Sequence, residues 1–261
     1  MEIAGIVALV GVGLTLGVMG GGGSIFSVPI LIYLFSLDVV MASTYSLFIV
    51  GTTSTVGVLS RPNIHLADIQ RASWLGVPSV IAVFVTRTWL LDAIPEVVWP
   101  LAGFVLTKRT LILFILVVAL VTSSVFMIRP PLSSVKSASP ITNRYALIPI
   151  GLLIGMLSGM AGVGGGFLVL PALVLIARIP FVQAVGTALI IIAFNSWLGF
   201  VGGMLHHTIN WSFLLSVTAL AVVGIIMGNH FTQQVRIHHL RVIVGWISLG
   251  ISCMILLREI L

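Results

Sequence analysis

The residues most able to do chemistry in this chain form a run of glycines between Gly159 and Gly166 (GMAGVGGG), inside the apolar stretch 146–177. That stretch is longer than the roughly 20 helical residues that span a bilayer. Because each glycine costs about 1 kcal/mol in a helix relative to alanine, we expect a helix, a break and a second short helix. Unpaired backbone N–H groups at such a break are tolerated in a membrane only inside protein, and they attract anions. The run therefore predicts an anion site at a helix break.

A similar run occurs near the N-terminus, where residues 19–29 align with residues 161–171 at a constant offset of 142. The ungapped alignment extends from residues 13–57 to residues 155–199, and thirteen of its 45 residue pairs are identical, more than composition alone explains. Duplicated halves with discontinuous helices are typical of secondary transporters. The backbone positions expected to line the site are Gly21, Gly22, Gly23 and Ser24 in the first break, and Gly164, Gly165 and Gly166 in the second.

Neutral polar side chains come after each glycine run. We predict that Asn195, an amide within a long apolar stretch, contacts the anion, with Thr53 at the equivalent position of the first half. Thr187 and Ser196 are further candidates. The alternative for each is a hydrogen bond between helices, which contributes about 0.6 kcal/mol. No Lys or Arg falls at the centre of an apolar segment, so we expect helix ends and neutral donors, without a salt bridge, to hold the anion.

Two histidines, His65 and His207, occupy equivalent positions of the two halves. Each could titrate near neutral pH and couple transport to protons, or could simply cap a segment at the membrane interface. The adjacent pairs 206–207 and 238–239 do not make a metal site, because neighbouring helical residues do not face one another. The carboxylates lie near segment ends, which leaves three alternatives for coupling: a proton carried by histidine, sodium held by backbone carbonyls, or no coupling ion. We expect no metal and no cofactor.

Composition places the chain among polytopic membrane proteins, since 59% of its 261 residues are hydrophobic, 7% are charged, and the mean hydropathy is +1.25. The net charge of +6 does not indicate nucleic-acid binding, because the basic residues are scattered at segment ends and not clustered. The chain therefore predicts a multi-pass protein of a bacterial-type inner membrane, with the lipid bilayer as its surroundings.

The apolar segments predict an all-α fold of two homologous four-segment repeats, with a broken first helix in each. The first repeat covers residues 1–128 and includes an interfacial insertion at 91–109, a linker covers 129–145, and the second repeat covers 146–261. The segments fall at about 4–36, 39–60, 72–91, 110–128, 146–177, 181–205, 211–229 and 240–257.

The distribution of Lys and Arg bears on membrane topology. If all eight segments cross the membrane, six Lys and Arg residues lie on each side, which gives no positive-inside signal. If the broken segments fold back without crossing, eight Lys and Arg residues lie on one side of the membrane and four on the other. The second arrangement gives three crossings per repeat, so the repeats would be inverted and their broken tips would meet near the midplane.

The glycine runs, together with the segments after them, resemble the sulfite exporter TauE/SafE family of membrane transporters. The second-half signature comprises residues 159–171 (GMAGVGGGFLVLP), 184–187 (AVGT) and 194–196 (FNS). The first-half version comprises residues 17–29 (GVMGGGGSIFSVP) and 42–46 (ASTYS). The resemblance covers nearly the whole chain and implies transport of sulfite, organosulfonates or related sulfur-containing anions. The insertion at 91–109 and the difference between Ser24 and Gly166 depart from the plainest pattern of the family.

Together these observations predict a secondary transporter of a small anion that works by alternating access, with one half rocking against the other. A passive anion channel remains the first alternative. An intramembrane enzyme is disfavoured, because Ser196 has no histidine at helical spacing and the nucleophile motif Gly-Xaa-Ser-Xaa-Gly is absent. The sequence leaves the exact substrate, the direction of transport, the coupling ion and the oligomeric state open.

Overall fold

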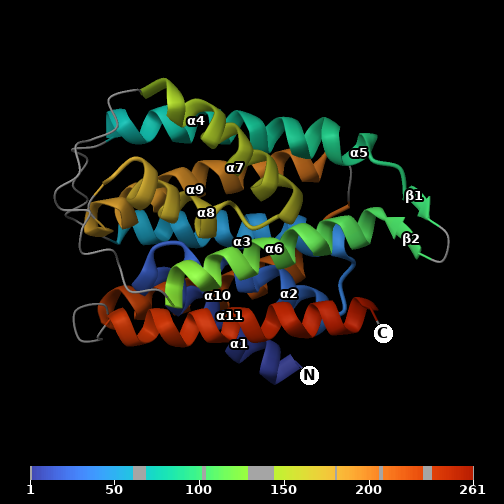
Figure 1. The fold of residues 1–261 in the computed structure, drawn as a ribbon. Helices are drawn as coiled ribbons and strands as arrows, with labels where there is room; N and C mark the ends of the chain where they lie inside the picture. Colours follow the sequence, from blue (N-terminus) through green and yellow to red (C-terminus); the bar gives the residue numbers. More distant parts are fainter. Residues whose placement is uncertain are drawn as a thin grey trace.

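The computed structural model describes residues 2–60, 69–101, 104–128, 144–179, 181–205, 208–231 and 237–260. The first half contains α1 (Glu2–Met19), η1 (Gly22–Phe26), α2 (Ser27–Tyr33), α3 (Val39–Leu59), α4 (Ile69–Val85), η3 (Thr86–Leu90), α5 (Leu91–Ala93), β1 (Val97–Leu101), β2 (Phe104–Thr107) and α6 (Lys108–Ile128). The second half contains η5 (Arg144–Ala146), α7 (Leu147–Ala161), α8 (Gly166–Pro171), η6 (Ala172–Ile176), α9 (Phe181–Met204), α10 (Trp211–Phe231) and α11 (Ile237–Ile260). The long helices lie roughly along one axis and form a bundle (Figure 1).

Long apolar helices confirm the predicted multi-pass helical architecture. Within the described ranges, five helices are long and apolar enough to cross a membrane, at residues 39–59, 72–90, 108–128, 183–204 and 211–230. α11 adds a shorter apolar part at Val242–Arg258. Large apolar side chains cover the outside of the bundle, and Leu153, Phe194 and Trp246 are each more than half exposed. Such a surface suits lipid and not water.

Each repeat begins with a broken helix, as the glycine runs predict. α1 ends at Met19, and Gly20 adopts a left-handed conformation with φ of 70° before the 3₁₀ turn η1 and the short α2. α7 ends at Ala161, and Gly162 adopts the same conformation with φ of 71° before α8 and the π-helical turn η6. Glycine adopts the left-handed backbone conformation without the steric penalty that a Cβ atom brings, which explains why both helices end at these glycines.

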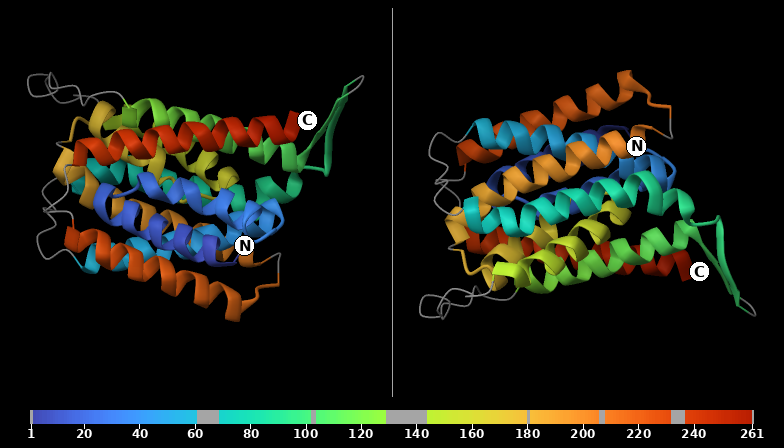
Figure 2. Two further views of the ribbon diagram at one scale, coloured as in Figure 1. Left: turned by 90° about the horizontal axis from the view of Figure 1, so that it is seen from below. Right: turned by 90° about the horizontal axis from the view of Figure 1, so that it is seen from above.

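The chain reverses direction at both breaks. α1 and α2 enter and leave the bundle at one end, whereas α7 and α8 enter and leave it at the opposite end (Figures 1 and 2). Both termini lie at the first of these ends, while α6 finishes and α7 begins at the other (Figure 2). This is the course expected if the broken segments do not cross. Most of the predicted linker, residues 129–143, lies outside the described residues.

Backbone features recur at the offset of 142 residues found in the sequence. Ser36 and Arg178, one offset apart, are the non-glycine residues with positive φ among those described, and both have φ of 55°. The ends of α1 and α7 show the same offset, at Met19 and Ala161. The predicted repeat leads one to expect these coincidences, although the duplication itself stays a prediction.

The two halves of the sequence do not pack as separate bodies. α1 packs mainly on α10 of the other half, and α7 packs mainly on α4. α3 lies against α9, and α6 lies against α11. Every one of these large helix contacts therefore joins the first half of the chain to the second.

The buried apolar side chains form two clusters. The larger contains residues of α1, α2, α3, α6, α10 and α11, together with Phe167 beside the second break. The smaller contains residues of α4, α7, α8 and η6 and the first half of α9, with Leu75, Ile154 and Ile192 among them. The breaks thus lie where the two clusters meet.

Glycines allow the closest helix contacts, as Gly13 and Gly155 show. A Cβ atom on Gly13 would overlap the carbonyl oxygen of Ala221 in α10. A Cβ atom on Gly155 would overlap the carbonyl oxygen of Ser79 in α4. Small residues let membrane helices approach until their backbones touch.

Two glycines of α1 should therefore respond oppositely to replacement by alanine. We expect Gly13→Ala to lower the free energy of unfolding by about 1–3 kcal/mol, because the backbone of α10 would have to shift. Gly11 has no atom within 4 Å of an added Cβ, so Gly11→Ala should raise helix stability by up to about 1 kcal/mol. Thermal unfolding of both variants in detergent checks this pair. Equal midpoints would contradict the packing of α1 on α10.

The predicted insertion contains a β-hairpin, which the all-helical prediction did not include. β1 and β2 pair antiparallel, with Leu101 opposite Phe104 and Val97 opposite Thr107. The hairpin projects beyond the helices at the end where the termini lie (Figures 1 and 2). The stretch is rich in β-branched and aromatic residues, which favour strands where no helix covers them.

Candidate anion site at the second helix break

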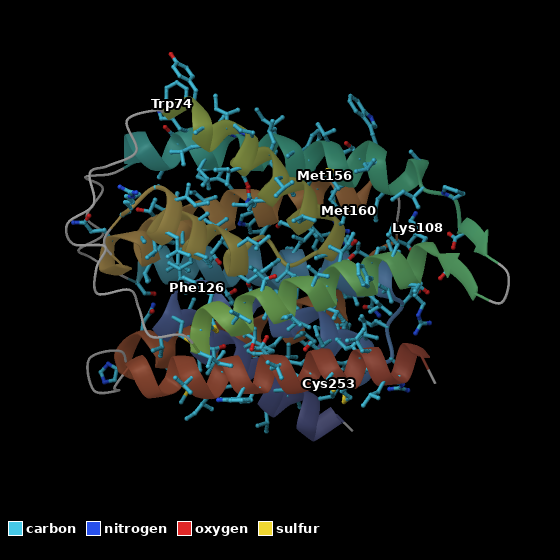
Figure 3. All side chains as sticks on the ribbon, viewed as in Figure 1. Trp74, Lys108, Phe126, Met156, Met160 and Cys253 are labelled. Carbon is cyan, nitrogen blue, oxygen red and sulfur yellow. The ribbon has the colours of Figure 1, made fainter. Side chains whose placement is uncertain are left out.

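The two breaks touch one another inside the bundle. A Cβ atom on Gly166 would lie only 2.6 Å from the carbonyl oxygen of Gly21 and 2.8 Å from Ser24 Oγ. Ser24 Oγ in turn donates a hydrogen bond to the Gly21 carbonyl at 2.8 Å. Met160, just before the second break, lies between the two ends of the bundle (Figure 3). Gly21 and Ser24 of the first break therefore lie against Gly166 of the second.

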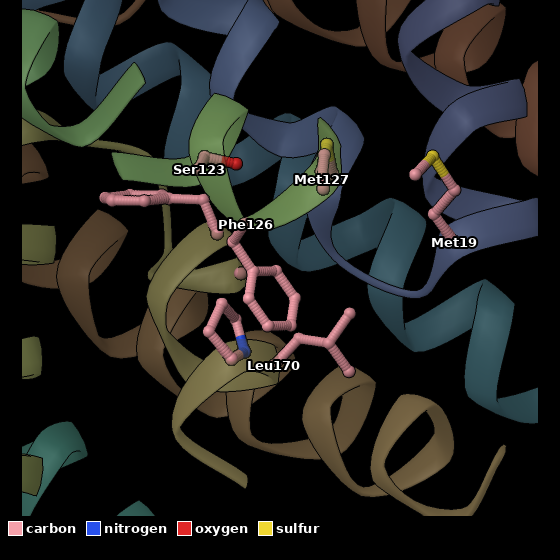
Figure 4. A pocket seen from close by; sticks show the side chains of 9 residues that line it. Met19, Ser123, Phe126, Met127 and Leu170 are labelled. Atoms are coloured by element: carbon pink, nitrogen blue, oxygen red, sulfur yellow. The ribbon is translucent and has the colours of Figure 1, made fainter. Parts of the chain in front are cut away.

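The space directly between the breaks is small and mainly apolar. A cavity of about 10 Å³ separates Gly22 from Gly166, and Met127 of α6 packs against Gly22 (Figure 4). This volume holds at most about one water molecule. The cavity lining consists of Met19, Gly22, Ser123, Phe126, Met127, Gly166, Phe167, Leu170 and Pro171. An anion would not fit there without a conformational change.

Polar groups gather instead on the other side of the second break. Gly164 and Gly165 both have left-handed backbones, with φ of 69° and 80°. A Cβ atom on Gly165 would lie 3.0 Å from Ser158 Oγ and 3.4 Å from Asn195 Nδ2, and one on Gly164 would overlap Ser196 Oγ. We call Ser158, Asn195 and Ser196 the second-break cluster. α7 supplies the first of these residues and α9 supplies the other two.

The second-break cluster is buried and only partly hydrogen-bonded. All three side chains are fully buried. Asn195 Nδ2 donates to Ser79 Oγ at 2.8 Å, but Asn195 Oδ1, Ser158 Oγ and Ser196 Oγ have no partner among the described residues. Each unsatisfied buried group costs about 1–3 kcal/mol, so native proteins keep few of them. Three such groups around one loop indicate a place prepared for a polar ligand.

The loop backbone adds donors to the same place. Within the described part of the chain, the N–H groups of Gly164 and Gly165 donate no hydrogen bond, whereas Gly162 N–H is bonded to the Ser158 carbonyl. The Asn195 amide has a second N–H beyond the one that Ser79 accepts. A small anion could therefore receive backbone, amide and hydroxyl hydrogen bonds together.

One residue next to this loop overturns a prediction from the sequence. Arg87 is 2% exposed, although we expected neutral donors and no buried cation at the site. Its Nη2 approaches Gly162 so closely that a Cβ on that glycine would collide with it. Its Nη1 donates a long hydrogen bond to Thr44 Oγ1 at 3.4 Å, and its Nε and Nη2 have no partner among the described residues.

The sequence suggested that Arg87 was interfacial because it lies near the end of the apolar segment 72–91. The π-helical turn η3 changes its direction, so the side chain points into the bundle and not along the membrane surface. Such turns are frequent at functional sites. The sequence feature that could have indicated a buried Arg87 is the polar triplet of residues 86–88 within an apolar segment. Ser79 and Ser158, whose contacts depend on tertiary packing, were also missed.

The first break also has loop N–H groups that donate no hydrogen bond in the described chain, at Gly21 and Gly22, but fewer of the polar side chains in its half lack a partner. Thr53 Oγ1 is bonded to the carbonyls of Ile49 and Val50 in its own helix. Ser27 Oγ pairs with Ser46 Oγ at 2.5 Å. The exceptions are Thr52 and Ser54, the latter one offset from Ser196, whose hydroxyl oxygens are buried without a partner in the described chain.

Thr187 is not brought to the second-break cluster. Its Oγ1 donates to the Gln183 carbonyl at 3.0 Å within α9. It borders an apolar groove of about 330 Å³ between α4 and α9, together with Ile81 and Phe194. His65 and His207 lie outside the described residues, so their proposed role in proton coupling stays a prediction. Among the residues that are described, no group of histidine, cysteine and carboxylate side chains could hold a metal ion.

A multi-pass helical bundle with two broken helices that meet inside it, beside buried and unpaired polar groups, is an architecture typical of membrane transporters. The chain belongs to the sulfite exporter TauE/SafE family, whose sequence profile matches residues 5–255. The family resemblance found in the glycine runs is thereby confirmed.

Curated relatives support the same class. A probable membrane transporter protein of Xylella fastidiosa is 24% identical over 99% of this chain and 98% of its own length. A probable membrane transporter protein of Methanocaldococcus jannaschii is 21% identical over 95% of this chain and 94% of its own length. The probable membrane transporter protein YunE of Bacillus subtilis is 28% identical over 48% of this chain and 46% of its own length. No solved structure matches the chain.

Proposed function

We propose that this protein is a secondary transporter that carries a small sulfur-containing anion, such as sulfite or an organosulfonate, across the cell membrane. The observation that carries the proposal is the second-break cluster, in which Ser158, Asn195 and Ser196 keep buried polar atoms unpaired beside Gly164 and Gly165. The description of the family as sulfite exporters supports the sulfur-containing class. Small oxyanions match the short hydroxyl, amide and backbone donors that the loop presents.

Most donors at this loop are neutral, which limits the affinity so that a carrier can release its ligand as well as bind it. Hydroxyl and amide groups bind an anion less strongly than a fixed ion pair does. In this proposal the anion lies against the loop of residues 162–165, and the first break closes the other side of the loop through the contact between Gly21 and Gly166. The sequence predicted donors from both breaks, which need not contribute equally, and we propose a site centred on the second break.

Transport requires the bundle to open, because the cavity between the breaks has only about 10 Å³. Rocking of one sequence half against the other does not fit the packing, since α1 lies on α10 and α7 lies on α4. We propose that the two hydrophobic clusters move against each other instead. The glycines with left-handed backbones at the breaks could act as hinges for such a movement.

Flux into liposomes that contain the purified protein tests the proposal. We expect saturable uptake of sulfite or a short sulfonate, faster than in empty liposomes and accelerated by the same anion on the opposite side. Sodium and pH gradients, applied one at a time, identify the coupling ion. Steady unitary conductance without saturation would show a channel, and no flux of any sulfur-containing anion would contradict the proposal.

A further inference from the structure

We propose that Arg87 is a substrate-binding residue, and that the Nε–Nη2 edge of its guanidinium binds two oxygen atoms of the transported anion. This inference rests on the proposed function and names the chemistry of the ligand more closely. The substrate is then an oxyanion that presents two oxygens to one side, as a sulfonate or sulfite does, and not a monatomic anion such as chloride.

The position of Arg87 joins it to the second-break cluster. Its Nη2 lies against Gly162, which is two residues before Gly164 and three before Gly165. Ser196 lies against Gly164, and Ser158 and Asn195 lie against Gly165. The loop therefore has the guanidinium at its beginning and the three neutral side chains further along. An anion bound at this loop would lie close to a fixed positive charge.

The surroundings of Arg87 are shaped to hold its side chain. A Cβ atom on Gly202 of α9 would lie 2.9 Å from Arg87 Cβ, and one on Gly203 would lie 2.9 Å from Thr44 Oγ1. Two adjacent glycines thus leave the room that the arginine and its hydrogen-bond partner occupy. The side chain is directed inward by η3, and it does not extend to the membrane surface as basic side chains near helix ends commonly do.

The unpaired atoms of Arg87 lie on one edge of the guanidinium. Nη1 is engaged by Thr44, whereas Nε and Nη2 are both buried without a partner among the described residues. These two groups carry parallel N–H bonds, which form the fork that binds two oxygens of a carboxylate or phosphate. No carboxylate in the described chain forms a salt bridge with Arg87. A buried charge without a partner is strongly unfavourable, so the arrangement indicates a ligand that arrives from outside the protein.

The repeat shows that this charge is not needed for the fold of a break. At the offset of 142, Gly162 corresponds to Gly20, Ser43 to Val185, and Arg87 to Asn229. Gly162 packs against Ser43, and Gly20 packs against Val185 in the same manner. The same backbone geometry is therefore built at the first break with an apolar and a neutral residue in place of Ser43 and Arg87. Only the second break combines it with a cation.

Three variants of the full-length protein in liposomes test the proposal. Arg87→Gln removes the charge and the fork, Arg87→Lys keeps the charge without the fork, and Arg109→Gln removes an exposed charge at the start of α6 as the control. Saturable uptake of sulfite and methanesulfonate is measured for each, with chloride as the comparison anion. Thermal unfolding in detergent, with and without methanesulfonate, reports folding and binding separately.

We expect Arg87→Gln to raise the KM for both oxyanions about thirtyfold or more, the range seen when one partner of a buried charge pair is removed. Arg87→Lys should retain part of the uptake but lose the preference for oxyanions over chloride. Neither variant should unfold at a lower temperature without ligand, because an unpaired buried charge is removed or moved. Methanesulfonate should raise the unfolding temperature of the wild type and of Arg109→Gln, and not that of Arg87→Gln.

The outcomes separate the two proposals. If the wild type transports no sulfur-containing anion, the proposed function fails. If the wild type transports them and Arg87→Gln has the same KM and the same ligand-induced stabilisation, the inference about Arg87 is wrong while the function stands. Should Arg87→Gln yield no folded protein, Arg87→Lys decides the question, and an unchanged preference for oxyanions over chloride in that variant would overturn it.

Discussion

Replacing Gly165 with leucine should abolish anion flux while most of the protein stays folded. Gly165 has φ of 80°, where a residue with a side chain is strained by about 1–2 kcal/mol. An added Cβ would lie 3.0 Å from Ser158 Oγ and 3.4 Å from Asn195 Nδ2, so the rest of a leucine side chain would fill the second-break cluster. The strain is small against the roughly 5–15 kcal/mol of a typical folded protein. Flux in liposomes, normalised to the folded fraction from size-exclusion chromatography, measures the effect.

The matched control for this variant is Gly250→Leu in α11. Gly250 has no atom within 4 Å of an added Cβ, and its helix lies far from the breaks in sequence. This control should keep wild-type flux and wild-type yield. Normal flux in Gly165→Leu, with the control behaving as expected, would show that the anion does not pass along this loop.

Asn195→Leu should lower the transport efficiency about fiftyfold, with the volume of the side chain nearly preserved. The substitution removes the amide that carries one unpaired oxygen and one further N–H in a fully buried place. Loss of a buried hydrogen-bonding partner costs about 1–3 kcal/mol, which corresponds to roughly 5- to 150-fold. Because Ser79 Oγ would also lose its donor, Ser79→Ala should be tested alongside and should show a smaller loss. Initial rates over a range of sulfite concentrations give the ratio.

Thr53, which lies one offset of 142 residues from Asn195, supplies the control for Asn195. Thr53 occupies the equivalent position of α3, but its hydroxyl is bonded to the carbonyls of Ile49 and Val50 and offers nothing to a ligand. Thr53→Val should therefore change the transport efficiency by less than about twofold, since only an internal bond of about 0.6 kcal/mol is lost. Equal losses in Thr53→Val and Asn195→Leu would argue for a symmetric site between the breaks and against one centred on the second break.

The local features of this fold could be predicted because they depend on residues close in sequence. Glycines at 20 and 162 stop α1 and α7 by adopting left-handed conformations, and hydropathy alone places α3, α6 and α9 within a few residues. The hairpin β1–β2 escaped prediction, because in a short segment between two helices an apolar stretch does not distinguish a strand from an interfacial turn. The interleaving of the halves depends on contacts between distant helices, which no local pattern encodes.

The candidate site was predicted in part. Asn195 and Ser196 were identified because polar residues are costly within long apolar segments. Thr53 looked equivalent in sequence, yet its hydroxyl is satisfied by its own helix, a choice that depends on the rotamer and not on the residue type. Arg87 was misplaced because one π-helical turn alters the direction of a side chain without any change in hydropathy. Its burial could be recognised only when α9 and the second break were placed around it.

The packing of α1 on α10 also bears on how the protein is made. α1 leaves the ribosome well before α10, whose surface covers it. At about 5–20 residues per second, α1 waits roughly ten to forty seconds for that surface. During this interval Gly13 and Gly17 are open to lipid or to other nascent helices. Biogenesis of this transporter therefore places a heavy demand on α1, which must stay inserted and unpaired until α10 has been made.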